Sequence, residues 1–346
     1  MWADDWTDEK LAELEKKITE VYEEARRDLD KKAERYFKKF EQRYKKEYEA
    51  YKNGEYTRDE FISWVYAQIG RGKKWEILRD TMAERVTNAN EVAASYINDY
   101  TPTIFSLNAN FEAFIAEGSH PNVSFTLFNE VTVKRLIEKD RKILPERKID
   151  VPKDLKWNQK KLQNALLQGI LQGESAGKIA NRFANVANMN RSSAIRNART
   201  AVTGAQNAGI YETMKREEAM GITAYRYWNS TKDLKTRPSH RVLDKEERKV
   251  GEKFSNGLLH PGDMNGRPEE VYNCRCALVS KDRIQVTQRK ERVTNPQWLA
   301  LGNTDEERKE KAKEIEKTTG KYIPKTVVVN EMSYREWEKW KESQLK

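Results

Sequence analysis

Both cysteines and two of the three histidines lie between residues 240 and 276. Cys274 and Cys276 are separated by one residue, so on a strand their side chains would point to the same face. Two thiolates together with His240 and His260 would supply the four ligands of a closed zinc site. The spacing differs from that of a standard zinc finger, and a second interpretation stays open. In it, the cysteines are small buried hydrophobic residues and the histidines are hydrogen-bonded loop residues.

The same stretch permits a catalytic interpretation. A metal-dependent phosphodiesterase site could use His240 as general base and Arg237 to hold a phosphate group. Asp233 and Asp244 would supply carboxylates. A metal-dependent, nuclease-like enzyme using the region of His240, Asp233 and Cys274 is therefore the alternative function. The set matches no catalytic motif with a clear mechanism, and its acids and arginines also suit ion pairs that fix loop shape. We predict no catalytic residues and expect a protein that is not an enzyme.

The elements around this stretch form a small α+β module. A helix is expected from about Arg191 to Met220, where Gly221 ends it. Tyr225–Trp228 alternates like a strand, and Glu270–Val279 is a second expected strand. Polar residues recur along one face of the helix at three- and four-residue steps, namely Arg196, Arg199, Thr200, Thr203 and Asn207.

An ordered series of residues from the helix to the second cysteine resembles a known family. The series contains Arg199, Thr200, Asn207, Gly221, Trp228, Asp233, Thr236, Arg237, His240, Leu243, Asp244, Asn273, Cys274, Arg275 and Cys276. In this order and spacing it resembles the Mu F-like minor head proteins of tailed phages, also called head morphogenesis proteins. One departure is Lys245, because the family often has a glycine after the Leu-Asp pair.

The resemblance implies a minor capsid protein that joins the head during assembly. It implies association with the portal protein at the portal vertex, contacts with coat or scaffold protein, and contact with packaged double-stranded DNA during packaging or ejection. The location implied is the virion head, with the host cytoplasm as the site of assembly. The family is not known as an enzyme class, and no cofactor is expected apart from the zinc considered above.

The first 150 residues match no motif, so their periodicity carries the prediction. Apolar residues recur from Leu11 to Tyr51, which is 40 residues in 11 steps, or 3.64 residues per step. This spacing predicts one long, nearly straight helix from Thr7 to Lys52. Its single apolar stripe must pack on something, and both later helices of this chain and another protein are open as partners.

The whole chain is predicted to be an α+β protein with four consecutive regions. These are a helical N-terminal region (1–150), a helical connector (151–190), the Mu F-like module (191–285) and a charged C-terminal tail (286–346). Within them the local signals predict a helix capped by Thr57 and Glu60, a loop at Thr101-Pro102, a short helix over Asn108–Ala116, a helix from Asn158, a lone strand over Lys325–Val329 and a last helix capped by Ser333.

Composition narrows the class of partner. Charged residues make up 35% of the chain, and the net charge is +10. Residues 178–300 hold 23 Lys and Arg against 13 Asp and Glu, so this region carries an excess of +10. That excess suits DNA or an acidic protein surface, although a solvated surface is the alternative. The sequence has neither a run of about 20 apolar residues nor a signal-peptide pattern at its start, so we expect no membrane partner.

Overall fold

The structure, a computed structural model, describes residues 3–39, 41–67, 72–120, 123–172, 174–283, 292–328 and 333–344. It contains two compact units. The first, here called the sheet unit, comprises Met1–Leu11, Asp99–Glu146 and Arg199–Lys346. The second, the helical unit, comprises Ala12–Asn98 and Arg147–Ala198. Each unit combines segments that are distant in the sequence, whereas the sequence patterns predicted consecutive regions.

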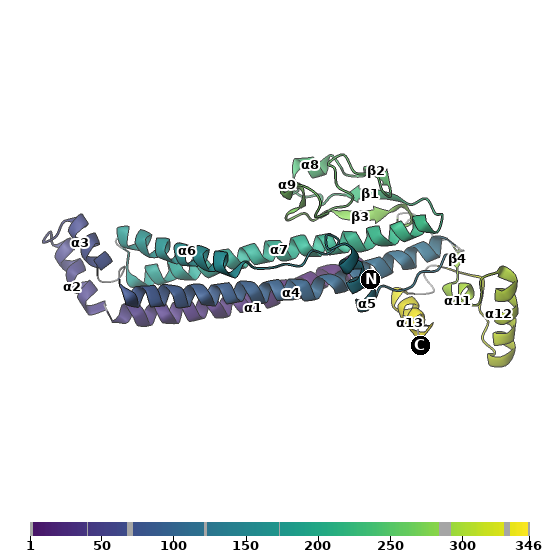
Figure 1. Cartoon of the computed structure of the whole chain (residues 1–346), viewed down its shortest axis with the longest axis horizontal. Coiled ribbons are helices and arrows are strands. Elements are labelled where there is room, and N and C mark those ends of the chain that lie inside the picture. Colours follow the sequence, from purple (N-terminus) through teal and green to yellow (C-terminus); the bar gives the residue numbers. More distant parts are fainter. Residues whose placement is uncertain are drawn as a thin grey trace. The chain divides into compact units, whose positions relative to one another are not determined.

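The helical unit contains parts of α1 (Ala3–Lys38), α4 (Lys73–Ser119) and α7 (Ala176–Ala219), together with α2 (Glu41–Lys52), α3 (Arg58–Val65) and α6 (Val151–Leu171) (Figure 1). One apolar core joins these helices. Its largest buried side chains are Phe37, Phe61, Trp75 and Phe183. Such a core forms because each helix has one apolar face to remove from water.

The predicted long N-terminal helix is present, but it ends earlier than its pattern indicated. α1 ends at Lys38 and α2 begins at Glu41, while Phe40 lies outside the described residues. The apolar stripe continues into α2 as three tyrosines whose rings lie 5.0–5.8 Å from the ring of Phe61 on α3, namely Tyr44, Tyr48 and Tyr51. The stripe therefore packs within the chain.

A buried polar network links four helices of the helical unit. Asn90 of α4 accepts a hydrogen bond from the Tyr22 hydroxyl (2.5 Å) and donates to Asp154 (2.7 Å) and Asn190 (2.9 Å). Asn190 in turn donates to Asn158 on α6 (3.0 Å). An unpaired buried amide costs free energy. Such a network therefore favours one register of the packed helices over neighbouring registers, in which these amides would lose their partners.

Two predicted helix ends are absent from the structure. α4 continues through Pro102, so the predicted loop at Thr101-Pro102 is wrong and the expected short helix 108–116 is part of α4. A proline inside a helix costs about 3 kcal/mol, and burial of the following Ile104 and Phe105 offsets that cost. The second predicted end is the start of a helix at about Arg191. It is absent because α7 runs without a break from Ala176 to Ala219. α6 begins at Val151, with Asp150 as its N-cap.

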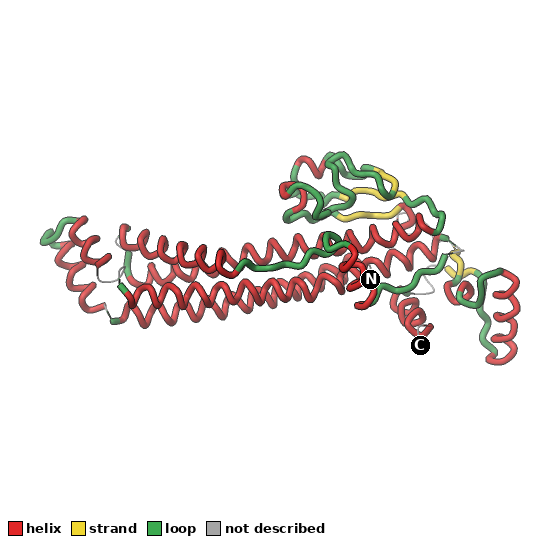
Figure 2. The backbone as a smooth tube through the Cα atoms, viewed as in Figure 1, coloured by secondary structure: helices red, strands yellow, loops and turns green. Residues whose placement is uncertain are grey.

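The sheet unit contains a three-stranded antiparallel sheet beside the second half of α7. Its strands, in the order β2-β1-β3, are β1 (Tyr225–Asn229), β2 (Glu247–Lys249) and β3 (Ala277–Ser280). Figure 2 shows these strands in yellow. Two four-residue helices, α8 (Pro238–Arg241) and α9 (Pro268–Val271), lie in the connections. The α+β class and the strand at 225–228 are confirmed, but only the end of the strand expected over 270–279 is a strand.

The C-terminal region also folds within the sheet unit. α11 (Pro296–Leu299) and α12 (Asp305–Thr319) are helical, and β4 (Arg292–Thr294) pairs with β5 (Thr326–Val328). The strand expected at 325–329 is thus paired, and Val329 lies outside the described residues. Another helix of this unit, α5 (Glu130–Lys139), comes from the segment Asp99–Glu146. The last helix, α13 (Tyr334–Gln344), begins at the predicted Ser333–Glu336 cap and buries Trp337 completely.

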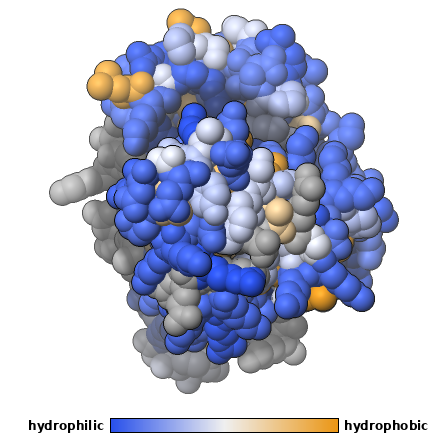
Figure 3. Space-filling model, turned by 90° about the vertical axis from the view of Figure 1, so that its left-hand side faces the viewer, coloured by the Kyte–Doolittle hydropathy of each residue, from blue (hydrophilic) through white to orange (hydrophobic). Residues whose placement is uncertain are grey.

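The surface is mostly polar where it can be seen. Figure 3 views the side of α2 and α3, and its described residues are predominantly hydrophilic with a few separate hydrophobic ones. Among the described helices, none combines the length and the apolar character that a membrane span requires.

Candidate functional site

Three of the four predicted zinc ligands meet in the sheet unit. The Nδ1 atom of His240 lies 3.5 Å from the Cys274 sulfur and 3.4 Å from the Cys276 sulfur. The three ligand atoms all lie within 4.8 Å of one another. His240 belongs to α8, and both cysteines precede β3. All three side chains are buried, in contact with an apolar cluster that includes Trp228.

A buried carboxylate holds the other side of the imidazole. The Nε2 atom of His240 lies 2.9 Å from the Glu270 carboxylate. Ser239 and Asn256 also contact this carboxylate, and Arg237 donates to the Glu270 backbone carbonyl. Burial alone would raise the pKa of Glu270, but its contacts with Ser239, His240 and Asn256 outweigh burial and hold the pKa below its usual value. The ring orientation is therefore fixed from the side opposite the sulfurs.

The two thiols have unequal electrostatic environments. A hydrogen bond from the Cys274 thiol, followed by the contact with His240, lowers the pKa of Cys276 to about 4. The same thiol–thiol hydrogen bond, together with burial, raises the pKa of Cys274. The pair therefore favours one thiolate beside one thiol, and thiolates are the form in which cysteine binds metals.

Polar side chains of α7 hold the backbone of the Cys-x-Cys segment. The Thr200 hydroxyl accepts the Asn273 N–H (2.8 Å), and the Thr203 hydroxyl donates to the Cys274 carbonyl (2.8 Å). Asn273 has a φ of +55°, so the chain reverses just before the first cysteine. The predicted polar face of α7 thus holds the backbone that carries Cys274 and Cys276.

Asn207 makes the largest set of these contacts. Its amide nitrogen donates to the carbonyls of Thr203, Pro261 and Cys276 (2.9–3.1 Å), and its oxygen accepts the Leu278 N–H (2.7 Å). The loop that carries Pro261 can approach α7 because two glycines face each other. A Cβ added to Gly262 would lie 2.9 Å from the backbone of Gly204.

The residues of the catalytic interpretation each have a structural partner. Asp233 forms a bidentate pair with Arg275 (2.5 and 2.8 Å), and this pairing holds the pKa of Asp233 well below its usual range. Asp244 accepts the Ser230 N–H (3.0 Å), and Arg237 donates to backbone carbonyls. These contacts stabilise loops, and the nuclease-like alternative gains no support from them.

His260 does not join the other ligand candidates. Its Nδ1 atom lies 3.1 Å from the Pro261 carbonyl, its ring lies 5.6 Å from the ring of Tyr211, and burial lowers its pKa. The group of close ligand atoms therefore contains three residues and not the four that were expected. Sequence reasoning also missed Glu270, although Pro268 followed by two glutamates is a typical start of a helix.

Lys245 occupies the position where the resembling family often has glycine. Its φ is +67°, in the left-handed region that costs a non-glycine residue about 1–2 kcal/mol. Lys245→Gly should therefore raise the free energy of unfolding by about 0.5–1 kcal/mol, after the higher chain entropy of glycine is subtracted. Chemical denaturation would measure the change. Lys249→Gly, in strand β2, is the control and should lower stability, and a loss with Lys245→Gly would contradict the prediction.

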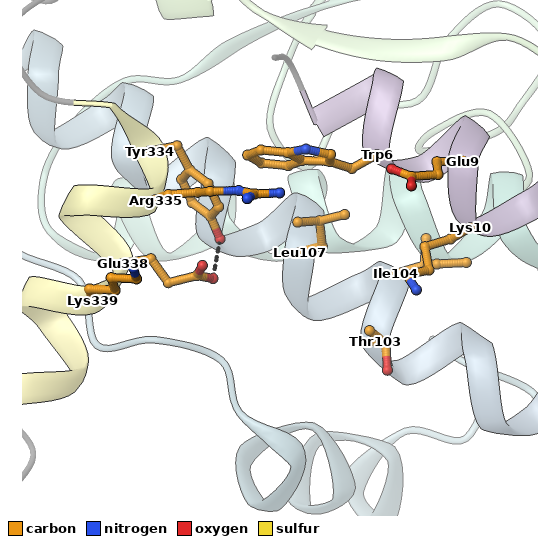
Figure 4. Close-up of a pocket in the computed structure, with 10 residues that line it drawn as sticks. All are labelled: Trp6, Glu9, Lys10, Thr103, Ile104, Leu107, Tyr334, Arg335, Glu338 and Lys339. Atoms are coloured by element: carbon orange, nitrogen blue, oxygen red, sulfur yellow. Dashed lines mark hydrogen bonds between the residues drawn. The ribbon is translucent and has the colours of Figure 1, made fainter.

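A pocket of about 500 Å³ lies elsewhere in the sheet unit, between the start of α1, α4 and α13 (Figure 4). Trp6 and Tyr334 form its aromatic wall, and the Tyr334 hydroxyl donates to Glu338 (2.6 Å). Its polar lining includes both acidic and basic side chains. None of the predicted site residues lines it.

Residues 160–279 match the family model described as Phage Mu protein F like protein. The match covers the end of α6, all of α7 and the sheet through β3. This part of the chain is therefore Mu F-like, which confirms the resemblance found in the sequence. The match begins upstream of residue 191, where the module was expected to start. No curated protein and no solved structure matches the chain.

Proposed function

We propose that this protein is a minor component of a tailed-phage head that joins the portal vertex during assembly. The match of residues 160–279 to the Mu F-like family carries the proposal, because that family acts in head morphogenesis. The motif residues support it, since the hydrogen bonds of Thr200 and Asn207 tie distant backbone segments together. A protein that works by binding needs a rigid surface more than an open catalytic cleft.

The sheet unit offers an apolar surface for such a contact. Leu234 and Val242 are 95% and 82% exposed, and Tyr272 is half-exposed. Leu234 and Val242 both lie in the connection between β1 and β2, where the Arg241 guanidinium donates to the Leu234 carbonyl (3.0 Å). We assign this surface to the portal protein. Contiguous exposed apolar surface is typical of protein interfaces, and we propose that these residues form such a surface.

The basic charge supports a second contact, with packaged DNA. Residues 178–300 carry the excess of +10, and the side chains of Lys232 and Arg267 in the sheet unit are 71% and 77% exposed. Exposed lysine and arginine bind phosphates without sequence preference. In this proposal, protein contacts hold the chain in the head, and DNA adds a salt-sensitive contribution.

Mass spectrometry of density-gradient fractions from a lysate of the parent phage tests the assembly role. We expect the chain to migrate with heads at low copy number, and to remain in heads that have been emptied of DNA. Leu234→Ser with Val242→Ser should reduce incorporation about tenfold, which is about 1.4 kcal/mol, without lowering thermal stability. Ile77→Ser, an exposed apolar residue of the helical unit, is the control and should incorporate normally. Recovery of the chain only in particle-free fractions would overturn the proposal.

A further inference from the structure

We infer that His240, Cys274 and Cys276 bind one zinc ion, through Nδ1 of the imidazole and the two sulfurs. This inference concerns the internal architecture of the sheet unit and does not depend on the role in head assembly.

The distances fit a zinc ion. Zinc binds sulfur at about 2.3 Å and nitrogen at about 2.0–2.1 Å in a tetrahedron, which places sulfur and nitrogen about 3.5 Å apart. The observed separations between Nδ1 and the two sulfurs are 3.5 and 3.4 Å. Both nitrogen–sulfur pairs therefore already lie at the spacing of neighbouring zinc ligands, and the two sulfurs lie within 4.8 Å of each other.

The chemistry of the donors selects the metal. Two thiolates and one imidazole are soft and borderline donors, which favour zinc over magnesium or calcium. No fourth His, Cys, Asp or Glu joins the group within the described part of the chain. A water molecule or a backbone oxygen would complete the tetrahedron. Because the cluster is buried, we assign the ion a structural role.

Glu270 supplies the outer contact that metal-binding histidines commonly have. A neutral ring that donates from Nε2 to Glu270 presents the lone pair of Nδ1 to the sulfurs. Glu270 is itself held by Ser239 and by Asn256. The tautomer and the ring orientation that zinc requires are thus set by the protein.

The backbone is also prepared for the ion. Thr203 and Asn207 of α7 donate hydrogen bonds to the carbonyls of Cys274 and Cys276. Arg275 lies between the two cysteines in the sequence, and Asp233 pairs with its side chain. These contacts involve no metal, so we expect the metal-free chain to stay folded and to accept zinc in a titration.

Zinc content and affinity of the purified, reduced full-length chain test the inference. We expect one zinc per chain after dialysis, and release of the one thiol proton that the cysteine pair retains as zinc binds. Cobalt(II) substituted for zinc should show sulfur-to-metal charge-transfer absorption. Glu270→Gln should weaken zinc binding about 10–100-fold, because the outer contact to the ring is weakened. Cys276→Ser should weaken it further.

His260→Gln is the matched control, because this second histidine of the region lies outside the group and the variant should keep its zinc. Loss of zinc from His260→Gln, with retention in Glu270→Gln, would overturn the assigned ligands. A reduced wild-type chain that takes up neither zinc nor cobalt would overturn the site itself. A native chain lighter by two hydrogen atoms would show a disulfide instead and would also overturn it. If Cys276→Ser does not fold, the cobalt spectrum of the wild-type chain decides.

Discussion

Replacing Asn207 with leucine is expected to lower the free energy of unfolding by about 3–5 kcal/mol, because several buried backbone groups would lose their partners at once. The side chain is fully buried and serves three carbonyls and one N–H. Leucine has a similar volume, so the expected loss comes from unpaired polar groups and not from a cavity. The Leu278 N–H and the Cys276 carbonyl would be left without this partner beside the sheet.

Chemical denaturation followed by circular dichroism would measure this loss. Asn197→Leu, at a partly buried position of the same helix, is the control and should change stability by less than about 0.5 kcal/mol. Asn207→Asp distinguishes the contribution of the amide oxygen from that of the amide nitrogen. A carboxylate still accepts the Leu278 N–H but cannot donate to the three carbonyls. It should therefore destabilise the protein as much as leucine does. A loss below 1 kcal/mol in both variants would show that water replaces the amide.

The sequence series that resembles the Mu F-like family is explained largely by backbone geometry. Thr200 and Asn207 on α7 reach segments more than 60 residues away in the chain. Asn273 has a positive φ value. Such positions tolerate few residue types, so they form a recognisable pattern. The module could therefore be predicted from sequence, while the reason for each residue required the structure.

Helix continuity was less predictable, because local signals compete with packing. Pro102 is a strong local breaker, yet α4 passes through it and buries Phe105 in the next turn. The C-terminal region was expected to be a charged tail, since its average composition is polar. Within it, the predicted last helix is anchored by Trp337, which is fully buried. Average composition conceals single anchoring residues of this kind.

Ligand types could be counted from the sequence, but their distances could not. His240 and His260 are equivalent as residue types, and only the fold separates the one beside the sulfurs from the one beside Tyr211. Glu270 is 30 residues from His240 in the chain. Contacts of this kind depend on how α8 and α9 meet, which no local pattern specifies.

The docking of the last helix depends on a buried ion pair. Glu117 of α4 is completely buried, and the Lys341 ammonium lies 2.5 Å from its carboxylate. The Trp337 indole also donates to Glu117 (2.8 Å), as does the Phe125 N–H. Burial raises the pKa of Glu117, and Lys341 opposes that rise. The carboxylate thus relies on the lysine to remain charged inside the unit.

Lys341→Met should lower the free energy of unfolding by about 3–5 kcal/mol near pH 8, because it leaves a buried carboxylate without its cation. The loss should shrink as the pH falls. Without Lys341 the folded-state pKa of Glu117 rises further above its unfolded value of about 4.3, so the native state binds the extra proton and stability decreases as pH rises through that pKa. Denaturation at several pH values would measure this. Lys339→Met, an exposed neighbour on α13, should show no such trend, and an equal loss at pH 5 and pH 8 would contradict the role of the charge.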